Sequence, residues 1–216
     1  QPNAMGGREV RGLANMLAAH LELENHEHQQ LVQTFWGSPL IAQKPGLKAI
    51  DLFEAVESGK IRAIWIMATN PVVSLPNADQ VKRALDKCQF VVVSDICQDT
   101  DTTQYADVLL PALGWGEKDG TVTNSERRIS RQSQFLDAPE QTKADWWAVS
   151  QVAQKMGFLG FDFKNSHEIF LEHAQLSAYQ NLDVSSRQNI KNFRYFNLQG
   201  LTHLSFEAYQ NLKPIQ

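Results

Sequence analysis

The sequence predicts an α/β fold with a short, mainly parallel β-sheet flanked by helices, followed by a helical carboxyl-terminal lobe. Two apolar runs, residues 61–67 and 90–93, are separated by a segment with helical apolar spacing at 77–87. This is a β-α-β pattern. A third apolar run at 108–110 closes at Pro111, and helical patterns dominate the chain beyond residue 158. We therefore expect an α/β domain over residues 1–157 and a helical extension over 158–216.

The segments before the sheet are expected to be helical. Gly6 and Gly7 allow a sharp turn, and Arg8 then opens a segment with Leu13, Leu17 and Leu21 at helical spacing. Residues 47–56 form a second amphipathic pattern that leads into the first strand. After the sheet, helices are expected from Trp146 to Gly157, over 167–178, and over about 205–212.

Polar residues follow the predicted strands. The run at 61–67 has almost no polar interruption, as expected of a parallel strand covered on both faces, and it stops at the sequence ATNP, residues 68–71. The second strand ends in Ser94 and Asp95, and a polar stretch at 99–103 precedes the third. Since ligands of open α/β sheets bind at the carboxyl ends of the strands, we expect these side chains to meet at one rim.

Composition excludes several classes of protein. The 216 residues carry a net charge of −4 with scattered Lys and Arg, so a nucleic-acid or anionic membrane partner is not expected. No apolar run approaches the roughly 20 residues of a membrane span. Cys88 and Cys97 form no CxxC pair, which argues against zinc, iron–sulfur and disulfide sites and favours a reducing cytoplasm. The chain shows no leader sequence and does not begin with Met, so we expect it to be an excerpt of a larger protein.

Three motifs carry a resemblance to a known family. ATNP at 68–71, YADVLLP at 105–111 and WGEKDGTVTNSERR at 115–128 resemble the molybdopterin oxidoreductase family. The opening QPNAMGGREV at 1–10 is similar to the nitrate reductases of this family, and the whole chain to Gln216 resembles their bacterial assimilatory type. The resemblance implies a partial nucleotide-binding domain of the formate dehydrogenase and DMSO reductase kind, and reduction of nitrate to nitrite by the intact protein.

The resemblance also implies cofactors and partners. These are a bis-molybdopterin guanine dinucleotide with molybdenum, a 4Fe–4S cluster bound by an amino-terminal region outside this sequence, the rest of the same polypeptide, and an electron-donor protein or an NAD(P)H-linked partner. Neither cluster cysteines nor a convincing metal-ligand cysteine occurs here. We therefore expect the 216-residue chain alone to be inactive and to contain no metal ligand.

The nucleotide needs acceptors for guanine N–H groups and donors for phosphate oxygens. A carboxylate accepts two guanine N–H groups together, which makes Asp95 and Asp145 the acidic candidates. The other candidates for cofactor binding are Thr69, Asn70, Pro71, Ser94, Thr100, Gly120, Asn124 and Arg128. For each Thr or Asn taken singly, a turn residue that bonds its own backbone is an equally good interpretation.

The opening motif supplies the candidates for nitrate handling. The resemblance places Gln1, Arg8 and Glu9 near the substrate channel, and a planar guanidinium matches the trigonal oxygens of nitrate better than an ammonium does. The start of a helix at Arg8 would add unpaired backbone N–H groups and the positive end of the helix dipole, both of which attract an anion. The alternative is that Arg8 and Glu9 only cap a surface helix.

Other functions remain open alternatives. A formate dehydrogenase of the same family is disfavoured by the opening motif, and a nucleotide-binding or interaction module without catalysis is a further possibility. An NAD-binding domain is disfavoured because no G-x-G-x-x-G follows any strand. His20, His26 and His28 do not share a helix face, so we expect polar surface residues rather than a metal site.

Overall fold

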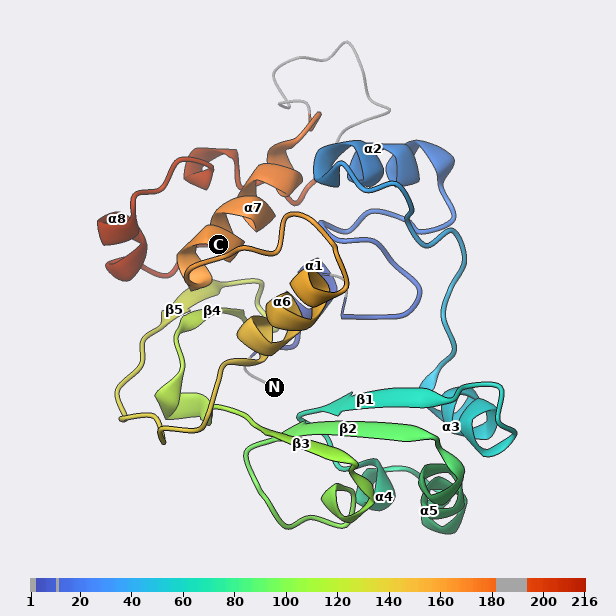
Figure 1. Cartoon of the computed structure of the whole chain (residues 1–216). Helices are drawn as coiled ribbons and strands as arrows, with labels where there is room; N and C mark the ends of the chain where they lie inside the picture. The colour runs from blue at the N-terminus through green and yellow to red at the C-terminus, as the bar shows by residue number, and fades with distance from the viewer. Residues whose placement is uncertain (1–2, 11, 182–193) are drawn as a thin grey trace. The chain divides into compact units, whose positions relative to one another are not determined.

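The computed structural model describes residues 3–10, 12–181 and 194–216 (Figure 1). It confirms the α/β fold with a parallel sheet and flanking helices. The chain divides into two compact units, each drawing on separate segments. The hairpin unit comprises Gln1–Gly46, Asp119–Ser133 and Asp162–Gln216, and the sheet unit comprises Leu47–Lys118 and Gln134–Phe161. The domain boundary expected between residues 157 and 158 stays a prediction.

The sheet unit contains three parallel strands in the order β1-β2-β3. Their bounds are Ala63–Met67 (β1), Phe90–Asp95 (β2) and Val108–Pro111 (β3). Met67 pairs with Ser94, and Asp95 pairs with Pro111. The carboxyl ends of the strands therefore lie at a common rim, as the polar residues after each apolar run predict.

Three helices pack on one face of this sheet: α3 (Ala49–Glu57), α4 (Pro71–Ser74) and α5 (Ala78–Lys87) (Figure 1). Their shared core with β1 and β2 consists of Phe53, Val56, Ile66, Val72, Val81, Ala84, Leu85, Val91 and Val93. Trp65 and Val92 alternate to the other face and stay half-buried within the described part of the chain. The expected cover on both faces of β1 is thus only partly present.

Helix α6 (Asp145–Lys155) begins close to the rim because the segment before it is tied to the end of β3. Lys143 N–H donates to the Pro111 carbonyl at 3.1 Å, and Leu113 N–H donates to the Lys143 carbonyl at 3.2 Å. Gly157 follows the helix with a φ of +84°, which glycine adopts without steric cost. The predicted helix and its end at Gly157 are confirmed.

The hairpin unit contains an antiparallel pair, β4 (Gly120–Thr123) and β5 (Ile129–Gln132), that the sequence did not predict. Its main helices are α2 (His26–Trp36), α7 (Ser166–Ala178) and α8 (Phe206–Gln210). Helix α7 agrees with the expected helix at 167–178, and α8 is shorter than expected. No helix among the described residues is long and apolar enough to span a bilayer.

The helix expected from Arg8 through Leu21 is wrong. The structure has only the four-residue helix α1 (Gly6–Glu9). Leu17 and Leu21 are buried, but they lie in irregular chain. Ala19 and His20 have φ values of 57° and 58°, which a right-handed helix excludes. A hydrogen bond of 2.7 Å from Ala19 N–H to the Glu9 carbonyl fixes this turn instead.

Candidate functional site

Several polar residues at the rim of the sheet unit bond to other groups of the rim. The Thr102 hydroxyl donates to Asn70 Oδ1 at 2.6 Å and accepts from Val72 N–H at 3.3 Å. Thr100 N–H donates to Thr103 Oγ1 at 2.7 Å. Of the two neighbouring candidates, Thr69 is exposed and Pro71 is buried as the first residue of α4. For Thr100 the turn interpretation therefore has direct support, whereas the Asn70 side chain bonds a loop residue 32 positions away. Contact of either residue with a nucleotide stays a prediction.

Asp95 also serves a turn. Its Oδ1 accepts the Cys97 N–H at 3.0 Å, the two-residue spacing of an Asx turn. Asp95 is half-buried at the end of β2. One oxygen of this carboxylate is thus already engaged by the backbone.

A pocket of about 280 Å³ lies at the carboxyl ends of β2 and β3. It brings together two of the predicted residues, Ser94 and Asp145. The full lining is Ser94, Leu110, Pro111, Ala112, Gln141, Lys143, Asp145, Trp147 and Ala148. The Ser94 hydroxyl accepts the Trp65 indole N–H at 2.8 Å, which leaves the hydroxyl hydrogen available to another acceptor.

Asp145 lines this pocket and has one carboxylate oxygen without a hydrogen-bond donor in the described part of the chain. Its Oδ2 lies 3.7 Å from Lys118 Nζ. Its Oδ1 is buried and receives no hydrogen bond from any described residue. A buried carboxylate oxygen without a donor costs about 1–3 kcal/mol, so ligand N–H groups are suitable partners for it. Between the two acidic candidates, the buried oxygen without a described donor and the position in the pocket lining favour Asp145.

Among the pocket residues that were not predicted as site residues, three have polar or aromatic side chains: Gln141, Lys143 and Trp147. Lys143 Nζ lies 5.8 Å from the centre of the Trp147 ring, within the range of a cation–π contact. Their position around the start of the predicted helix at Trp146 was the available signal. A cation and an aromatic surface beside a free carboxylate suit a ligand with phosphate and base groups.

The remaining cofactor candidates lie on the β4–β5 hairpin of the hairpin unit. The Gly120 carbonyl accepts from Arg131 Nη1 at 2.8 Å. Asn124 Oδ1 accepts from the N–H groups of Glu126 at 2.9 Å and Arg128 at 3.1 Å, so it organises the turn. The Arg128 side chain is exposed. Their cofactor contacts stay predictions.

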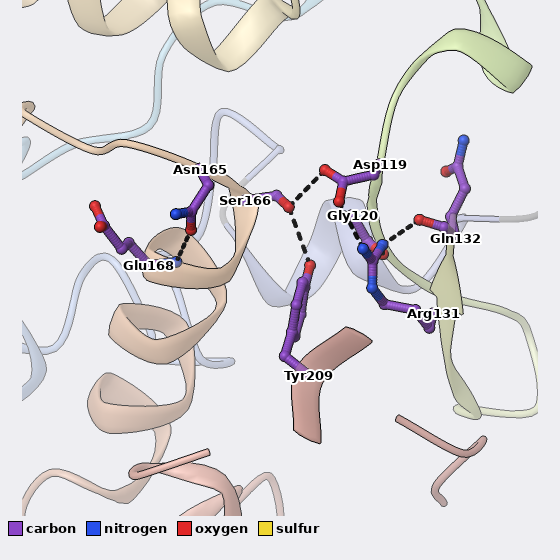
Figure 2. A network of polar contacts seen from close by, with 8 residues as sticks. All are labelled: Asp119, Gly120, Arg131, Gln132, Asn165, Ser166, Glu168 and Tyr209. Atoms are coloured by element: carbon purple, nitrogen blue, oxygen red, sulfur yellow. Dashed lines mark hydrogen bonds and ion pairs between the residues drawn. The ribbon is translucent and has the colours of Figure 1, made fainter. Parts of the chain in front are cut away.

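A polar network fixes this hairpin to α7 and α8 (Figure 2). Arg131 Nη2 donates to Asp119 Oδ2 at 2.5 Å, and the Ser166 hydroxyl donates to Asp119 Oδ1 at 2.7 Å. The Tyr209 hydroxyl donates to Ser166 Oγ at 3.3 Å, and the Arg131 guanidinium lies 4.4 Å from the centre of the Tyr209 ring. Burial raises the pKa of Tyr209. The network joins segments that are distant in sequence, so no local sequence pattern predicted it.

The candidates for nitrate handling lie in the same unit. Gln1 is outside the described residues, and Arg8 is exposed on α1. Because α1 has only four residues, it does not provide the helix-start anion site that the sequence suggested. Glu9 is only 4% exposed. Its Oε2 accepts from the Thr123 hydroxyl at 2.7 Å.

Burial raises the pKa of Glu9, against the lowering effects of the Thr123 hydrogen bond and the Arg127 charge. Burial also lowers the pKa of His20, with further lowering by the charges of Arg127 and Arg8. Cations from the hairpin turn and from α1 thus act on one histidine. The roles predicted for Gln1, Arg8 and Glu9 stay predictions.

Comparison with known proteins identifies the family. The sequence model of the family described as molybdopterin oxidoreductase matches residues 4–155. A nitrate reductase of Shewanella frigidimarina is 55% identical over 100% of this chain and 22% of its own length. A nitrate reductase of Klebsiella oxytoca is 50% identical over 100% of this chain and 24% of its own length. A putative formate dehydrogenase of Bacillus subtilis matches at 34% over 81% of this chain.

A solved structure agrees in fold. Acetylene hydratase from Pelobacter acetylenicus aligns with a TM-score of 0.58 over 98% of this chain and 25% of that protein, at 17% identity. This similarity concerns the fold alone. The whole chain aligns with these two curated nitrate reductases, and it spans about a quarter of their length. The family model matches residues 4–155, and the similarity to the two nitrate reductases covers the whole of this chain. The chain therefore belongs to the molybdopterin oxidoreductase family.

Proposed function

We propose that the intact protein reduces nitrate to nitrite with a bis-molybdopterin guanine dinucleotide cofactor. In this proposal the present chain supplies contacts to a guanine dinucleotide and residues that orient nitrate. Similarity over the whole chain to two proteins named nitrate reductase supports the reaction. Family membership supports a molybdopterin cofactor.

The observation that carries the cofactor role is Asp145, which lines the pocket at the rim and has a buried Oδ1 without a hydrogen-bond donor among the described residues. Guanine carries adjacent N–H donors that a carboxylate accepts as a pair, and an ionised acceptor makes these hydrogen bonds stronger than neutral ones. Ser94 adds a hydroxyl and Lys143 a positive charge, which suit ribose or phosphate oxygens. These residue types fit a guanine nucleotide.

Nitrate orientation is assigned to Arg8. Its guanidinium is exposed and permanently charged, and its planar fork can donate two parallel hydrogen bonds to nitrate. Molybdenum, when bound, would supply the redox chemistry that removes an oxygen atom from nitrate. The role of this chain is to bind and orient.

Further parts of the proposal rest on resemblance. They are the guanine dinucleotide form of the cofactor, a 4Fe–4S cluster held by another part of the polypeptide, an electron-donor protein or NAD(P)H-linked partner, and a cytoplasmic location. The domain assignment of residues 1–157 to nucleotide binding belongs to the same proposal.

The test uses the intact protein. Wild type is expected to form nitrite from nitrate with a reduced dye as electron donor. In Asp145→Asn, an amide replaces the carboxylate, and its NH2 donors would face the N–H donors of guanine. This mismatch should cost about 1–3 kcal/mol of binding free energy. Molybdenum and pterin content should therefore fall. Asp99→Asn, at an exposed acid of the rim loop, is the matched control. Full cofactor content in Asp145→Asn would remove Asp145 from this role.

Formate oxidation is the second candidate because a putative formate dehydrogenase is also similar, at 34% identity. The same purified protein decides between them. Formate turnover without nitrate turnover would favour this candidate, and cofactor retention without either activity would favour a nucleotide-binding module.

A further inference from the structure

The β4–β5 hairpin is a fixed base within the hairpin unit. Arg131 is 8% exposed at its side chain and holds the strand ends through Asp119 and the Gly120 carbonyl. Tyr209, fully buried, stacks beneath the guanidinium (Figure 2). Ile129 also exchanges two backbone hydrogen bonds with Ile215, at 2.8 and 3.0 Å. The β4–β5 hairpin is therefore held by hydrogen bonds, an ion pair and an aromatic contact.

Thr123, the last residue of β4, connects this base to the opening segment at three points. Its N–H donates to Asn3 Oδ1 at 2.9 Å, and its carbonyl accepts from Met5 N–H at 3.2 Å. Its hydroxyl donates to Glu9 Oε2 at 2.7 Å. Thr123 is 3% exposed and Glu9 is 4% exposed, so water competes little for this hydrogen bond.

The opening segment has little freedom to shift. A Cβ atom at Gly6 would lie 1.9 Å from Asn3 Oδ1, so the Asn3 side chain can hold this position only because residue 6 is glycine. The Glu9 carbonyl is engaged by Ala19 N–H at 2.7 Å. Arg8, the residue between these fixed points, is the exposed one.

We propose that Thr123 is a positioning residue that holds Arg8 in place through its hydrogen bond to the buried Glu9 carboxyl. The proposal rests on the proposed role of Arg8 in nitrate orientation and goes beyond it, because Thr123 itself touches no substrate. Side-chain burial and the bond to Glu9 assign the hydroxyl, rather than the backbone of Thr123, to this task. A misplaced guanidinium loses orientation even though its charge is retained.

The test compares two substitutions of Thr123 in the intact, fully metallated protein. Thr123→Val keeps the shape and the two backbone hydrogen bonds but removes the hydroxyl, whereas Thr123→Ser keeps the hydroxyl. Thr121→Val, at a half-buried threonine of the same strand, is the matched control. Nitrate kinetics, cofactor content and hydrogen exchange of the backbone amides at residues 8–10 are measured on each preparation.

In Thr123→Val, we expect kcat/KM for nitrate to fall about tenfold, mainly through KM, as for the loss of one buried hydrogen bond. Exchange at residues 8–10 should accelerate while cofactor content stays at the wild-type level. Thr123→Ser should recover both properties to within about twofold of wild type, and Thr121→Val should change neither.

A double substitution separates this inference from the function on which it rests. If Thr123 acts through Arg8, adding Thr123→Val to Arg8→Ala should cause no further loss of kcat/KM, because the two effects are not additive. Additive losses would overturn the inference. Normal nitrate kinetics in Thr123→Val with a clear loss in Arg8→Ala would also overturn it while leaving the proposed function intact. Normal kinetics in Arg8→Ala would instead remove Arg8 from nitrate handling.

Discussion

The sheet unit and the hairpin unit use polar side chains in different ways. At the rim of the sheet unit, Asp95 bonds a backbone group two residues away, and Thr100 and Thr103 bond one another. In the hairpin unit, Glu9 bonds a residue 114 positions away in sequence, and Ser166 bonds one 47 positions away. In these examples the rim bonds within short turns and the hairpin unit bonds across the chain, although Thr102 also links the rim loop to Asn70, 32 positions away.

This difference bears on what each unit can contribute. The turns at Asp95 and Thr100 can form independently of one another, and Asp145 Oδ1 has no hydrogen-bond donor among the described residues. Long-range bonds in the hairpin unit fix one segment against another, as positioning requires. Substitutions in these turns should therefore have local effects, while substitutions in the hairpin network should affect several segments together.

The largest effect is expected for Arg131→Met. Methionine can keep the apolar contact with Tyr209, but Asp119 and the Gly120 carbonyl lose their donor. Removing one member of a buried ion pair costs about 3–5 kcal/mol, and since Asp119 remains 39% exposed and can be hydrated, we expect about 2–3 kcal/mol. The melting temperature of the intact protein should fall, and exchange should rise in both β4 and α7.

The matched control lies in the sheet unit. Arg83 forms an exposed ion pair with Glu57 at 2.9 Å. Because water screens this pair, Arg83→Met should cause a much smaller loss of stability. Equal losses from the two substitutions would contradict the larger contribution expected of the buried arginine.

Acid should destabilise the hairpin unit through His173. Burial, with a further contribution from the His20 charge, lowers the pKa of His173 from 6.5 to about 4. The unfolded chain therefore takes up a proton below pH 6.5 while the folded chain does not, so stability is lost as the pH falls from about 6.5 to about 4. At about 1.4 kcal/mol per pH unit, this amounts to about 2 kcal/mol by pH 5.

The check compares melting temperatures at pH 7 and pH 5 in the wild type and in His173→Gln. The decrease on acidification should be smaller in the variant. The raised pKa of Glu9 has the opposite sign, favouring the folded state on acidification, but it is common to both proteins and cancels in the comparison. His203→Gln, at an exposed histidine, is the control. An identical decrease in all three proteins would show that His173 does not carry the effect.

The two units also differ in how far sequence predicted them. The β-α-β pattern is a local signal: apolar runs mark β1 and β2, and Asn77 caps the helix between them. The rim follows from it because parallel strands end on the same side. In the hairpin unit, the turn at Ala19 and His20 depends on a bond to the Glu9 carbonyl, so the apolar spacing of Leu13, Leu17 and Leu21 was misleading.

The candidate site shows the same limit. Sequence identified both Asp95 and Asp145, but the choice between them required burial and hydrogen-bond partners. Thr123 resembled any other strand threonine until its contact with a distant buried carboxyl was known. Residue type indicates which chemistry a side chain can perform, whereas long-range packing decides which side chain remains free to perform it.

A smaller effect is expected for Thr102→Val at the rim. The Thr102 hydroxyl is fully buried and links Asn70 Oδ1 to Val72 N–H. Its loss should cost about 1 kcal/mol, and Thr102→Ser should restore most of it. Because this hydroxyl joins the loop at 99–103 to the start of α4, increased hydrogen exchange is expected near residues 70–72 and 100–103. Increased exchange throughout the sheet unit would contradict a role limited to these two segments.

The smallest effect is expected for Asp95→Asn, which sharpens the choice between the two rim acids. Asparagine keeps an Oδ1 that can accept the Cys97 N–H, so the turn should persist and stability should change by less than about 0.5 kcal/mol. If Asp145 is the guanine acceptor, molybdenum and pterin content in Asp95→Asn should stay near the wild-type level while Asp145→Asn loses both. Metal analysis and the fluorescence of released pterin on the same preparations test this. A loss in Asp95→Asn as large as that in Asp145→Asn would mean that local turn bonding does not exclude a carboxylate from the ligand, and the distinction drawn at this rim would fail.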